Sequence, residues 1–328
     1  MKILFIGGTG VISSACSALC SEKGDDLYLL NRGNSNLPDG INYKLLKGDI
    51  WDFDKVKSLI SQHTFDVVVE WLGYSPDRVR RDYELFKGKT GQYIFISSAS
   101  VYQKPDLWKP ITEETPAYNP YWSYSQAKIK CEETAMEYYR SDGFPVTIVR
   151  PSHTYDKTKI PLYGGYNVID RMLQNKKIII HGDGTSLWTL THHKDFAKGF
   201  VGLFGRKGTI GEIYHITSDE VLTWNQICKT LGDALGVEPK IIHIPADLIK
   251  HFDNDWGDGL LGDKCHCMVF DNSKIKKLVP EFKAEIPFSR GAKEMAEWYL
   301  ADTSRQIVDD IINWKYDEII GWYEKGLR

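Results

Sequence analysis

The 328-residue sequence predicts an α/β protein with a doubly wound parallel sheet and a smaller, interleaved C-terminal lobe. The first observation behind this prediction is that short apolar runs, typical of buried parallel strands, alternate with helical segments in the first half of the chain. The second is a glycine-rich turn that directly follows the first run. The third is that polar or small residues follow each run, at the end of a parallel sheet where ligands bind.

The first strand is predicted over residues 2–6, and a helix over residues 13–22 follows the glycines. Asp49, Gly73 and Ser98 come after three later strands, so we expect them to converge on one crevice at the sheet edge. Those three strands are predicted over residues 42–47, 65–69 and 92–96, and the second strand of the chain is predicted over residues 27–30.

Gly7, Gly10 and Ser13 stand at the spacing of a dinucleotide-binding turn, in which the third glycine has become serine. The first glycine permits the turn, and the second lets backbone amides approach a pyrophosphate at a helix N-terminus. Serine is small enough for the close approach that the third position requires. By itself this pattern is also compatible with an ordinary turn, and the later motifs decide between the two.

Asn31 and Arg32 end the second strand about 20 residues after the glycines, where an adenosine ribose would lie. An acidic residue there would bind the ribose 2′-hydroxyl, whereas an arginine can hold a 2′-phosphate. Arg32 therefore shifts the expected cofactor slightly from NAD toward NADP. The alternative is that Arg32 is a solvated turn residue.

Tyr124 and Lys128 are four residues apart in a predicted helix, which stacks both side chains on one face. A tyrosine with its ordinary pKa near 10 is a poor base at neutral pH, but a nearby lysine ammonium and an oxidised nicotinamide favour the phenolate. With Ser98, the pair predicts an acid/base group for hydride chemistry at a carbinol carbon. The alternative for the pair alone is a surface helix contact.

Composition excludes several classes of protein. The net charge of −3 offers no footprint for nucleic acid, and Arg78, Arg80 and Arg81 stand among acidic residues, which predicts a solvated helix face. No apolar run approaches the roughly 20 residues of a membrane span, so we expect no membrane contact and a cytoplasmic protein. The cysteines at 265 and 267 lack a second ligand pair, so no metal is expected.

With these residues in view, the chain resembles the extended short-chain dehydrogenase/reductase superfamily, in its NAD-dependent epimerase/dehydratase branch, from residue 1 to about 300. The motifs that carry the resemblance are GGTGVI at 7–12, GDI at 48–50, SSASVY at 97–102, Tyr124-x-x-x-Lys128 and VRP at 149–151. The resemblance implies a Rossmann-type fold and an NAD(P) cofactor. It also implies that this cofactor contacts Gly7, Thr9, Gly10, Val11, Ile12, Asn31, Arg32, Asp49, Ile50, Gly73, Tyr124, Lys128 and Pro151.

The same resemblance gives each catalytic residue a role. Tyr124 is implied to be the acid/base, Lys128 to hold the nicotinamide ribose, and Ser98 to orient the reacting oxygen. Asp49 and Ile50 are implied to contact adenine. Dehydratases of this branch carry an Asp-Glu pair just after the catalytic serine or threonine, and this chain has Ala99 and Ser100 instead. An epimerase or a dehydrogenase is therefore favoured over a dehydratase.

Substrate expectations come mostly from departures from the family. Nucleotide-sugar enzymes of the family typically hold a diphosphate with two arginines; Trp188 takes the place of one, and only Lys264 is near the other. The usual Asn of the family after residue 151 is His153 here. We therefore expect an unphosphorylated or lightly charged sugar or derivative, contacted by Ser100, His153 and Trp188.

Aromatic residues in the segments expected to line or cover the cleft offer platforms for sugar rings, or simply pack in the core. They are Tyr102, Trp108, Tyr121, Trp122, Tyr155, Trp188 and Trp256. The reacting carbon, and the choice between an epimer and a ketone as product, do not follow from the sequence.

The second half of the chain departs from simple alternation. Strands predicted over residues 178–181 and 213–216, with helices over 224–235 and 246–252, indicate a smaller lobe. We expect a cofactor-binding domain over residues 1–152 plus roughly 184–217, and a substrate-binding lobe over roughly 153–183 and 218–328. In the tail, Ile307, Ile311, Trp314 and Ile319 have near-helical spacing, and we expect this stripe to pack on its own lobe or on a partner.

By analogy with the family, helices over residues 77–87 and 121–140 are expected to pair across a two-fold axis in a homodimer. Two alternatives of another class remain: some relatives bind RNA in plastids, and others sense redox state by binding a cofactor without turnover. The acidic balance of the chain speaks against the first. The second is disfavoured by the presence of Ser98, Tyr124 and Lys128, since a protein that only binds a cofactor has no use for an acid/base group.

Overall fold

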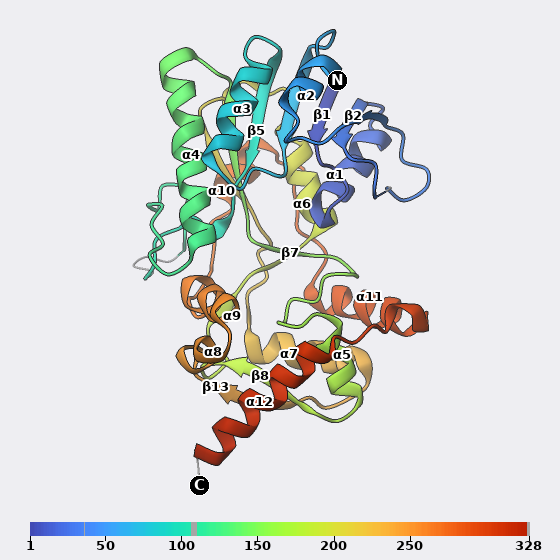
Figure 1. Ribbon diagram of the computed structural model, residues 1–328, viewed down its shortest axis with the longest axis vertical. Coiled ribbons are helices and arrows are strands. Elements are labelled where there is room, and N and C mark those ends of the chain that lie inside the picture. The colour runs from blue at the N-terminus through green and yellow to red at the C-terminus, as the bar shows by residue number, and fades with distance from the viewer. Residues whose placement is uncertain (36, 106–109, 327–328) are drawn as a thin grey trace.

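The computed structural model describes residues 1–35, 37–105 and 110–326, and a seven-stranded sheet organises its upper lobe (Figure 1). The strand order is β3-β2-β1-β4-β5-β6-β11 and every pairing is parallel, which confirms the predicted α/β class. The strands span Lys2–Ile6 (β1), Asp26–Asn31 (β2), Lys44–Lys47 (β3), Phe65–Glu70 (β4), Thr90–Ile96 (β5), Val146–Pro151 (β6) and Ile213–Ile216 (β11).

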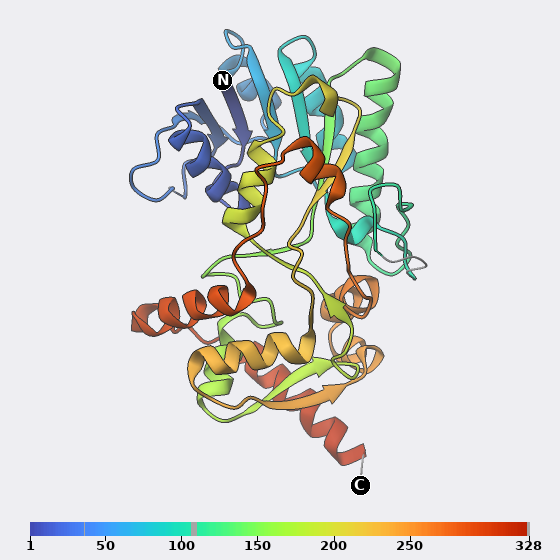
Figure 2. The ribbon, with the colours of Figure 1, turned by 180° about the vertical axis from the view of Figure 1, so that it is seen from behind.

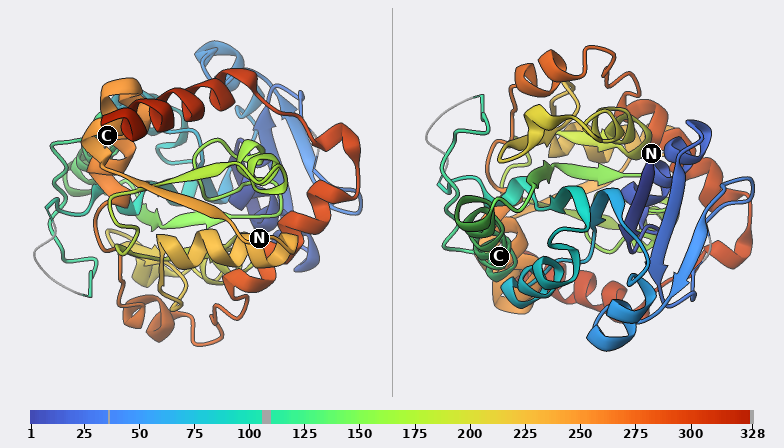
Figure 3. Two further views of the ribbon diagram at one scale, coloured as in Figure 1. Left: turned by 90° about the horizontal axis from the view of Figure 1, so that it is seen from below. Right: turned by 90° about the horizontal axis from the view of Figure 1, so that it is seen from above.

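Helices cover both faces of this sheet because alternate strand residues are apolar on both sides. Phe5 packs on the side of α1 (Val11–Glu22) and α6 (His193–Val201), whereas Leu4 packs on the other side. That other side is covered by α2 (Phe53–Leu59), α3 (Pro76–Phe86) and α4 (Ser123–Asp142) (Figures 1 and 3). The sheet is therefore doubly wound, with its strand order reversing beside β1.

The lower lobe holds a parallel pair, β8 (Lys177–His181) with β13 (Lys240–Ile244), packed among helices (Figure 2). These helices are α5 (Tyr166–Leu173), α7 (Trp224–Leu235), α8 (Ala246–Phe252), α9 (Asn254–Gly259), α11 (Phe288–Leu300) and α12 (Asp310–Gly326). Short pairs, β7 (His153–Tyr155) with β10 (Leu190–His192) and β9 (Leu187–Trp188) with β12 (Leu222–Thr223), join the lobes. Helices α7 and α8 have the predicted bounds.

One stretch of the predicted substrate lobe lies in the upper lobe. Around α10 (Ser273–Leu278), the side chains of Ile275, Val279 and Phe282 share a core with Phe5. The chain therefore enters the upper lobe and returns from it once more than the predicted boundary at 218–328 assumed, which adds two crossings between the lobes. The other predicted boundaries stay a prediction.

The expectation that Arg78 lies on a solvated helix face is wrong, although Arg80 is exposed as expected. Arg78 is fully buried, and its guanidinium pairs with Glu70 at 2.9 Å and with Asp82. It also donates to the Ile50 carbonyl at 2.8 Å. A charge run cannot show from spacing alone that one member turns into the protein, because that depends here on the Glu70 carboxylate, which comes from β4.

The prediction that the tail carries one apolar stripe is also wrong. Ile307, Ile311 and Trp314 are 74%, 70% and 62% exposed, and among the four predicted positions only Ile319 is buried. Helix α12 begins at Asp310 and packs through Tyr316, Ile319 and Ile320, so the tail does pack on its own lobe. No helix of the described chain is long and apolar enough to cross a bilayer.

Candidate functional site

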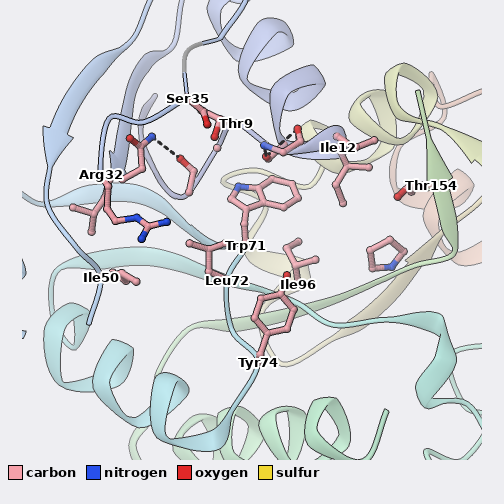
Figure 4. Close-up of a pocket in the computed structure, with 18 of the residues that line it drawn as sticks. Thr9, Ile12, Arg32, Ser35, Ile50, Trp71, Leu72, Tyr74, Ile96 and Thr154 are labelled. Atoms are coloured by element: carbon pink, nitrogen blue, oxygen red, sulfur yellow. Dashed lines mark hydrogen bonds between the residues drawn. The ribbon is translucent and has the colours of Figure 1, made fainter. Parts of the chain in front are cut away.

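A cavity of about 600 Å³, here called the sheet-edge cavity, lies at the carboxyl ends of the central strands (Figure 4). Arg32 and Ile50 lie at one end of it and Thr154 at the other, with Trp71 and Leu72 between them. Most of the predicted cofactor contacts line this cavity together with Ser98: Gly7, Thr9, Gly10, Val11, Ile12, Asn31, Arg32, Asp49, Ile50, Tyr124, Lys128 and Pro151. Gly73 does not line it, and only its carbonyl takes part, as described below.

The turn between β1 and α1 requires glycine at two positions. Gly7 and Gly8 have φ of +101° and +96°, where other residues are strained, and a Cβ on Gly8 would lie 2.6 Å from Leu29 Cδ2. Gly10 is the N-cap of α1, so the free amides of that helix begin at the cavity. Ser13, in place of the third glycine, is buried, and its hydroxyl accepts from the Gly10 amide at 2.8 Å.

Asn31 and Arg32 follow β2 at the rim of the cavity. The Asn31 side chain donates to the Gly7 carbonyl at 3.2 Å and accepts from the Gly33 amide at 2.8 Å, which ties the two turns together. Arg32 is exposed. Among the described residues that line the cavity, Asp49 is the one acid, and its carboxylate accepts from the Trp51 amide at 2.9 Å.

Ser98, Tyr124 and Lys128 all line the sheet-edge cavity. Ser98 caps a short 3-10 turn after β5, and Tyr124 lies in the first turn of α4. Lys128 Nζ lies 5.9 Å from the centre of the Tyr124 ring and donates to the carbonyls of Gly73 and Ile96, both at 2.8 Å. These two carbonyls belong to the chain just after β4 and at the end of β5, so adjacent strands position the lysine.

Burial is the largest cause of the pKa shifts of Tyr124 and Lys128. It raises the pKa of Tyr124 to about 12, with Tyr74 acting in the same direction and a hydrogen bond with Ser98 in the opposite one. Burial lowers the pKa of Lys128 to about 8. Contrary to our expectation, the protein alone therefore does not favour the phenolate, because burial is the largest cause acting on Tyr124 and the Lys128 ammonium is directed at two backbone carbonyls. A cationic ring beside Tyr124 would act in the opposite direction.

A second cavity of about 940 Å³, here called the interlobe cavity, opens on the other side of Tyr124. Ser98 and Tyr124 line both cavities, as do Tyr74, Pro151, Ser152 and Thr154. The three predicted substrate contacts, Ser100, His153 and Trp188, all line the interlobe cavity. The structure thus places the Ser98 and Tyr124 side chains on a wall shared by two adjoining spaces.

Ser100 is almost fully buried, so it holds its neighbours more than it reaches outward. Its hydroxyl lies 2.9 Å from the Ser98 hydroxyl and accepts from Ser125 at 2.8 Å. Trp188 Nε1 donates to His153 Nδ1 at 3.1 Å, and burial lowers the pKa of His153 to about 3.

Asp263 was missed by sequence reasoning, and it lines the interlobe cavity next to Lys264. Its Oδ1 is buried without a hydrogen-bond partner among the described residues, and burial raises its pKa. It lies in a short π-helical turn, residues 260–264, whose Gly262 carbonyl accepts from Asn119 at 2.7 Å. The same Asn119 amide donates to the Ser100 carbonyl. One side chain therefore links the turn that carries Asp263 to the backbone of Ser100. No local sequence pattern marks such a turn.

Three of the seven aromatic residues line the interlobe cavity: Trp122, Trp188 and Trp256. Tyr102 and Tyr155 are core residues instead, since both are fully buried and outside both cavities. Tyr121 is exposed and lines neither cavity, and Trp108 lies outside the described residues. The described lining of the interlobe cavity contains no arginine, and its lysines are Lys159 and Lys264.

The sheet-edge cavity suits a dinucleotide. Its glycine turn, the N-terminus of α1 and the strand-end residues form the kind of cradle in which backbone amides approach a pyrophosphate. Gly7, Gly10, Arg32 and Asp49 would hold the nucleotide half, and Tyr124 and Lys128 would lie at the nicotinamide half. The fold and site therefore define a Rossmann-type dinucleotide-binding protein.

Residues 3–217 match the NAD dependent epimerase/dehydratase family, and the chain belongs to that family. The resemblance drawn from the motifs is thereby confirmed.

Two curated relatives illustrate the range of this family. The chain is 31% identical over 261 residues to the chloroplast stem-loop binding protein of 41 kDa b from Arabidopsis thaliana, covering 74% of this chain and 65% of that protein. It is 23% identical over 330 residues to dTDP-D-glucose 4,6-dehydratase from Homo sapiens, covering 91% of this chain and 89% of the relative. The chain thus spans slightly less than two thirds of the chloroplast protein.

Solved structures with the same fold include family members in complex with NAD. UDP-glucuronic acid 4-epimerase from Bacillus cereus in complex with NAD has a TM-score of 0.72 at 21% identity, over 93% of this chain and 100% of that one. dTDP-glucose 4,6-dehydratase from Bacillus anthracis in complex with NAD has a TM-score of 0.73 at 22% identity, over 93% and 98%. At these identities the likeness shows the fold alone.

Proposed function

We propose that this protein is an NAD(P)-dependent sugar epimerase or oxidoreductase that acts at a carbinol carbon of a sugar or sugar derivative. The observation that carries the proposal is the wall between the two cavities, where Ser98 and Tyr124 face both spaces and Lys128 lies behind them. A cofactor in one cavity and a sugar in the other would meet at this wall.

The proposed roles follow from the position of each side chain. Tyr124 exchanges a proton with the hydroxyl or carbonyl oxygen of the substrate, and the Ser98 hydroxyl holds the same oxygen in place. Lys128 holds a ribose hydroxyl and keeps a positive charge beneath the tyrosine, fixed by two carbonyls. A bound nicotinamide would accept or return the hydride.

The lining of the interlobe cavity supports a lightly charged substrate. A diphosphate is usually held by bidentate arginines, and the described lining offers only the point charges of Lys159 and Lys264. Trp122 and Trp188 offer ring faces, and the Oδ1 of Asp263, which has no hydrogen-bond partner among the described residues, suits a sugar hydroxyl. Because relatives are named for dTDP- and UDP-sugars, these compounds are the comparison that tests this class.

Arg32 at the rim supports a slight preference for NADP over NAD. A homodimer through α3 and α4, and a cytoplasmic location, also stay predictions.

The test begins with mass spectrometry of any nicotinamide that co-purifies with the protein. The protein is then incubated with a panel of free sugars, polyols, sugar phosphates, UDP-sugars and dTDP-sugars while the absorbance of the reduced cofactor is followed. Retained NAD with an altered sugar and no net absorbance change indicates an epimerase, whereas exchangeable NADP with net change indicates a dehydrogenase. No conversion of any panel member would count against the proposal.

A second candidate function is RNA binding without turnover, which the identity to the chloroplast stem-loop binding protein favours. Filter binding of a stem-loop RNA at two salt concentrations tests it, because phosphate contacts weaken steeply with salt. Salt-dependent retention of RNA together with no conversion of the panel would favour this candidate. A cofactor-binding regulator would instead retain nicotinamide and show neither activity.

A further inference from the structure

His153 lies at the cavity proposed for the substrate, and one of its two ring nitrogens is already hydrogen-bonded to another side chain of the protein. It begins β7, two residues after the Pro151 end of β6, and it lines the interlobe cavity. Trp188 and Trp224 pack around the ring, with centroids 6.0 and 6.3 Å away. We propose that His153 is a specificity-determining residue whose imidazole, locked by Trp188 with its proton on Nε2, donates a hydrogen bond to an uncharged oxygen of the substrate.

The tautomer of His153 follows from the hydrogen-bonding chemistry of its contact with Trp188. An indole N–H can only donate, so the 3.1 Å contact from Trp188 Nε1 requires a lone pair on His153 Nδ1. Of the three forms of histidine, only the neutral tautomer protonated on Nε2 has a lone pair there. The other ring nitrogen is therefore a fixed donor.

The charges around the ring favour the same form. Lys264 and Lys159 are the charged groups that act on His153, from the π-helical turn and from the loop after β7, and both oppose an imidazolium. Burial acts in the same direction and is the largest cause of the lowered pKa. The tryptophans on the remaining sides carry no charge. The ring stays neutral across the physiological range.

A neutral donor selects a different ligand from a cationic one. An imidazolium would attract phosphate, whereas a neutral Nε2–H suits a carbonyl, hydroxyl or ring oxygen. This inference rests on the proposed function and deepens it, since it assigns to His153 the recognition of the sugar itself. His153 is then a positioning group for the atoms that Tyr124 would act on.

Nitrogen NMR of protein labelled on its histidines tests the lock without any substrate. Long-range proton–nitrogen spectra of the wild type are expected to show His153 as the Nε2–H tautomer, unchanged between pH 8 and pH 5, with the resonance assigned by its loss in His153→Gln. An Nδ1–H tautomer, or an imidazolium at pH 7, would overturn the proposal.

Two matched variants separate the lock from general packing. Trp188→Phe removes the indole N–H and keeps an aromatic ring, so His153 is expected to show both tautomers. Trp224→Phe makes the same truncation in the same cluster, but its Nε1 donates to the Lys264 carbonyl at 3.1 Å rather than to His153, so the single tautomer should persist. An identical response of His153 in both variants would contradict a lock by Trp188.

Kinetics with the sugar that the panel identifies test the recognition. His153→Leu is expected to raise KM and lower kcat/KM by about 10- to 100-fold, the effect of one lost hydrogen bond in a buried site, while cofactor affinity is unchanged. His153→Gln keeps an N–H donor at a similar reach and should recover most of the loss. Unaltered kcat/KM in His153→Leu would overturn the proposal.

The two proposals fail separately. Full turnover in Tyr124→Phe would remove the proposed function and leave the tautomer result standing, whereas a titrating His153 in an active enzyme would remove only this inference.

Discussion

The two cavities that meet at Tyr124 are built in different ways. The sheet-edge cavity is made largely by the ends of β1 to β6 and the residues that follow these strands. The interlobe cavity is made by side chains from segments between Tyr74 and Phe270, which no single element brings together. The difference teaches that one cavity follows from the strand order of a parallel sheet, whereas the other depends on how two lobes pack.

The two cavities also differ in chemical character. The sheet-edge cavity has glycine amides and a helix N-terminus, which suit the phosphates of any dinucleotide. The described lining of the interlobe cavity includes four tryptophans, a neutral histidine and a carboxyl oxygen without a hydrogen-bond partner among the described residues. Changes in the first cavity should therefore alter cofactor binding, and changes in the second should alter the choice of substrate.

The largest expected effect lies on the shared wall. Tyr124→Phe removes the proposed acid/base and should lower kcat by about 10²- to 10⁴-fold, with nearly unchanged cofactor affinity measured by calorimetry. Tyr74→Phe is the matched control, because Tyr74 lines both cavities too and its ring lies 6.4 Å from that of Tyr124. Equal losses in the two variants would show that the wall needs tyrosines for packing rather than for proton transfer.

The second effect concerns the support beneath the sheet-edge cavity. Arg78→Met leaves Glu70 and Asp82 as buried carboxylates without their cation, which should cost about 3–5 kcal/mol of unfolding free energy in urea denaturation. Arg80→Met, two residues along the same helix, removes only an exposed pair with Asp77 and should cost less than about 1 kcal/mol. Similar costs for both would mean that the buried cluster contributes little.

A third prediction uses pH. Burial lowers the pKa of Lys128 to about 8, and in the unfolded chain it returns to about 10.4. Between these values the unfolded state binds more protons, so this group makes the wild type more stable as pH rises from 8 to 10. Thermal unfolding of Lys128→Met should lack that increment, and parallel pH profiles of the two proteins would contradict the lowered pKa.

The smallest expected effect is at the rim. Arg32→Ala should weaken NADP binding by about 10-fold, the value of one exposed charge on a phosphate, and leave NAD binding nearly unchanged. Arg81→Ala is the control, since Arg81 packs over the Trp51 ring at 5.6 Å and does not line the cavity. A similar loss of NADP and NAD affinity in Arg32→Ala would return Arg32 to the solvated turn residue considered at first.

The sequence by itself determined the parallel sheet, the glycine turn and the set of residues at the strand ends. This was possible because the carboxyl ends of parallel strands lie at one edge of the sheet, so Asp49 and Ser98 both line one cavity at that edge. The placement of Tyr124 and Lys128 on one helix face could also be predicted, because it depends only on residues one helical turn apart.

The tertiary structure alone decided what depends on contacts between distant segments. Arg78 is buried because Glu70 on β4 receives it, and the tail helix turns Tyr316 inward and Trp314 outward because the lower lobe offers a core on one side only. Asp263 reaches the interlobe cavity through a π-helical turn held by Asn119, and His153 takes its tautomer from Trp188. Each of these depends on a partner that lies far away in the sequence, and a local pattern carries no information about such a partner.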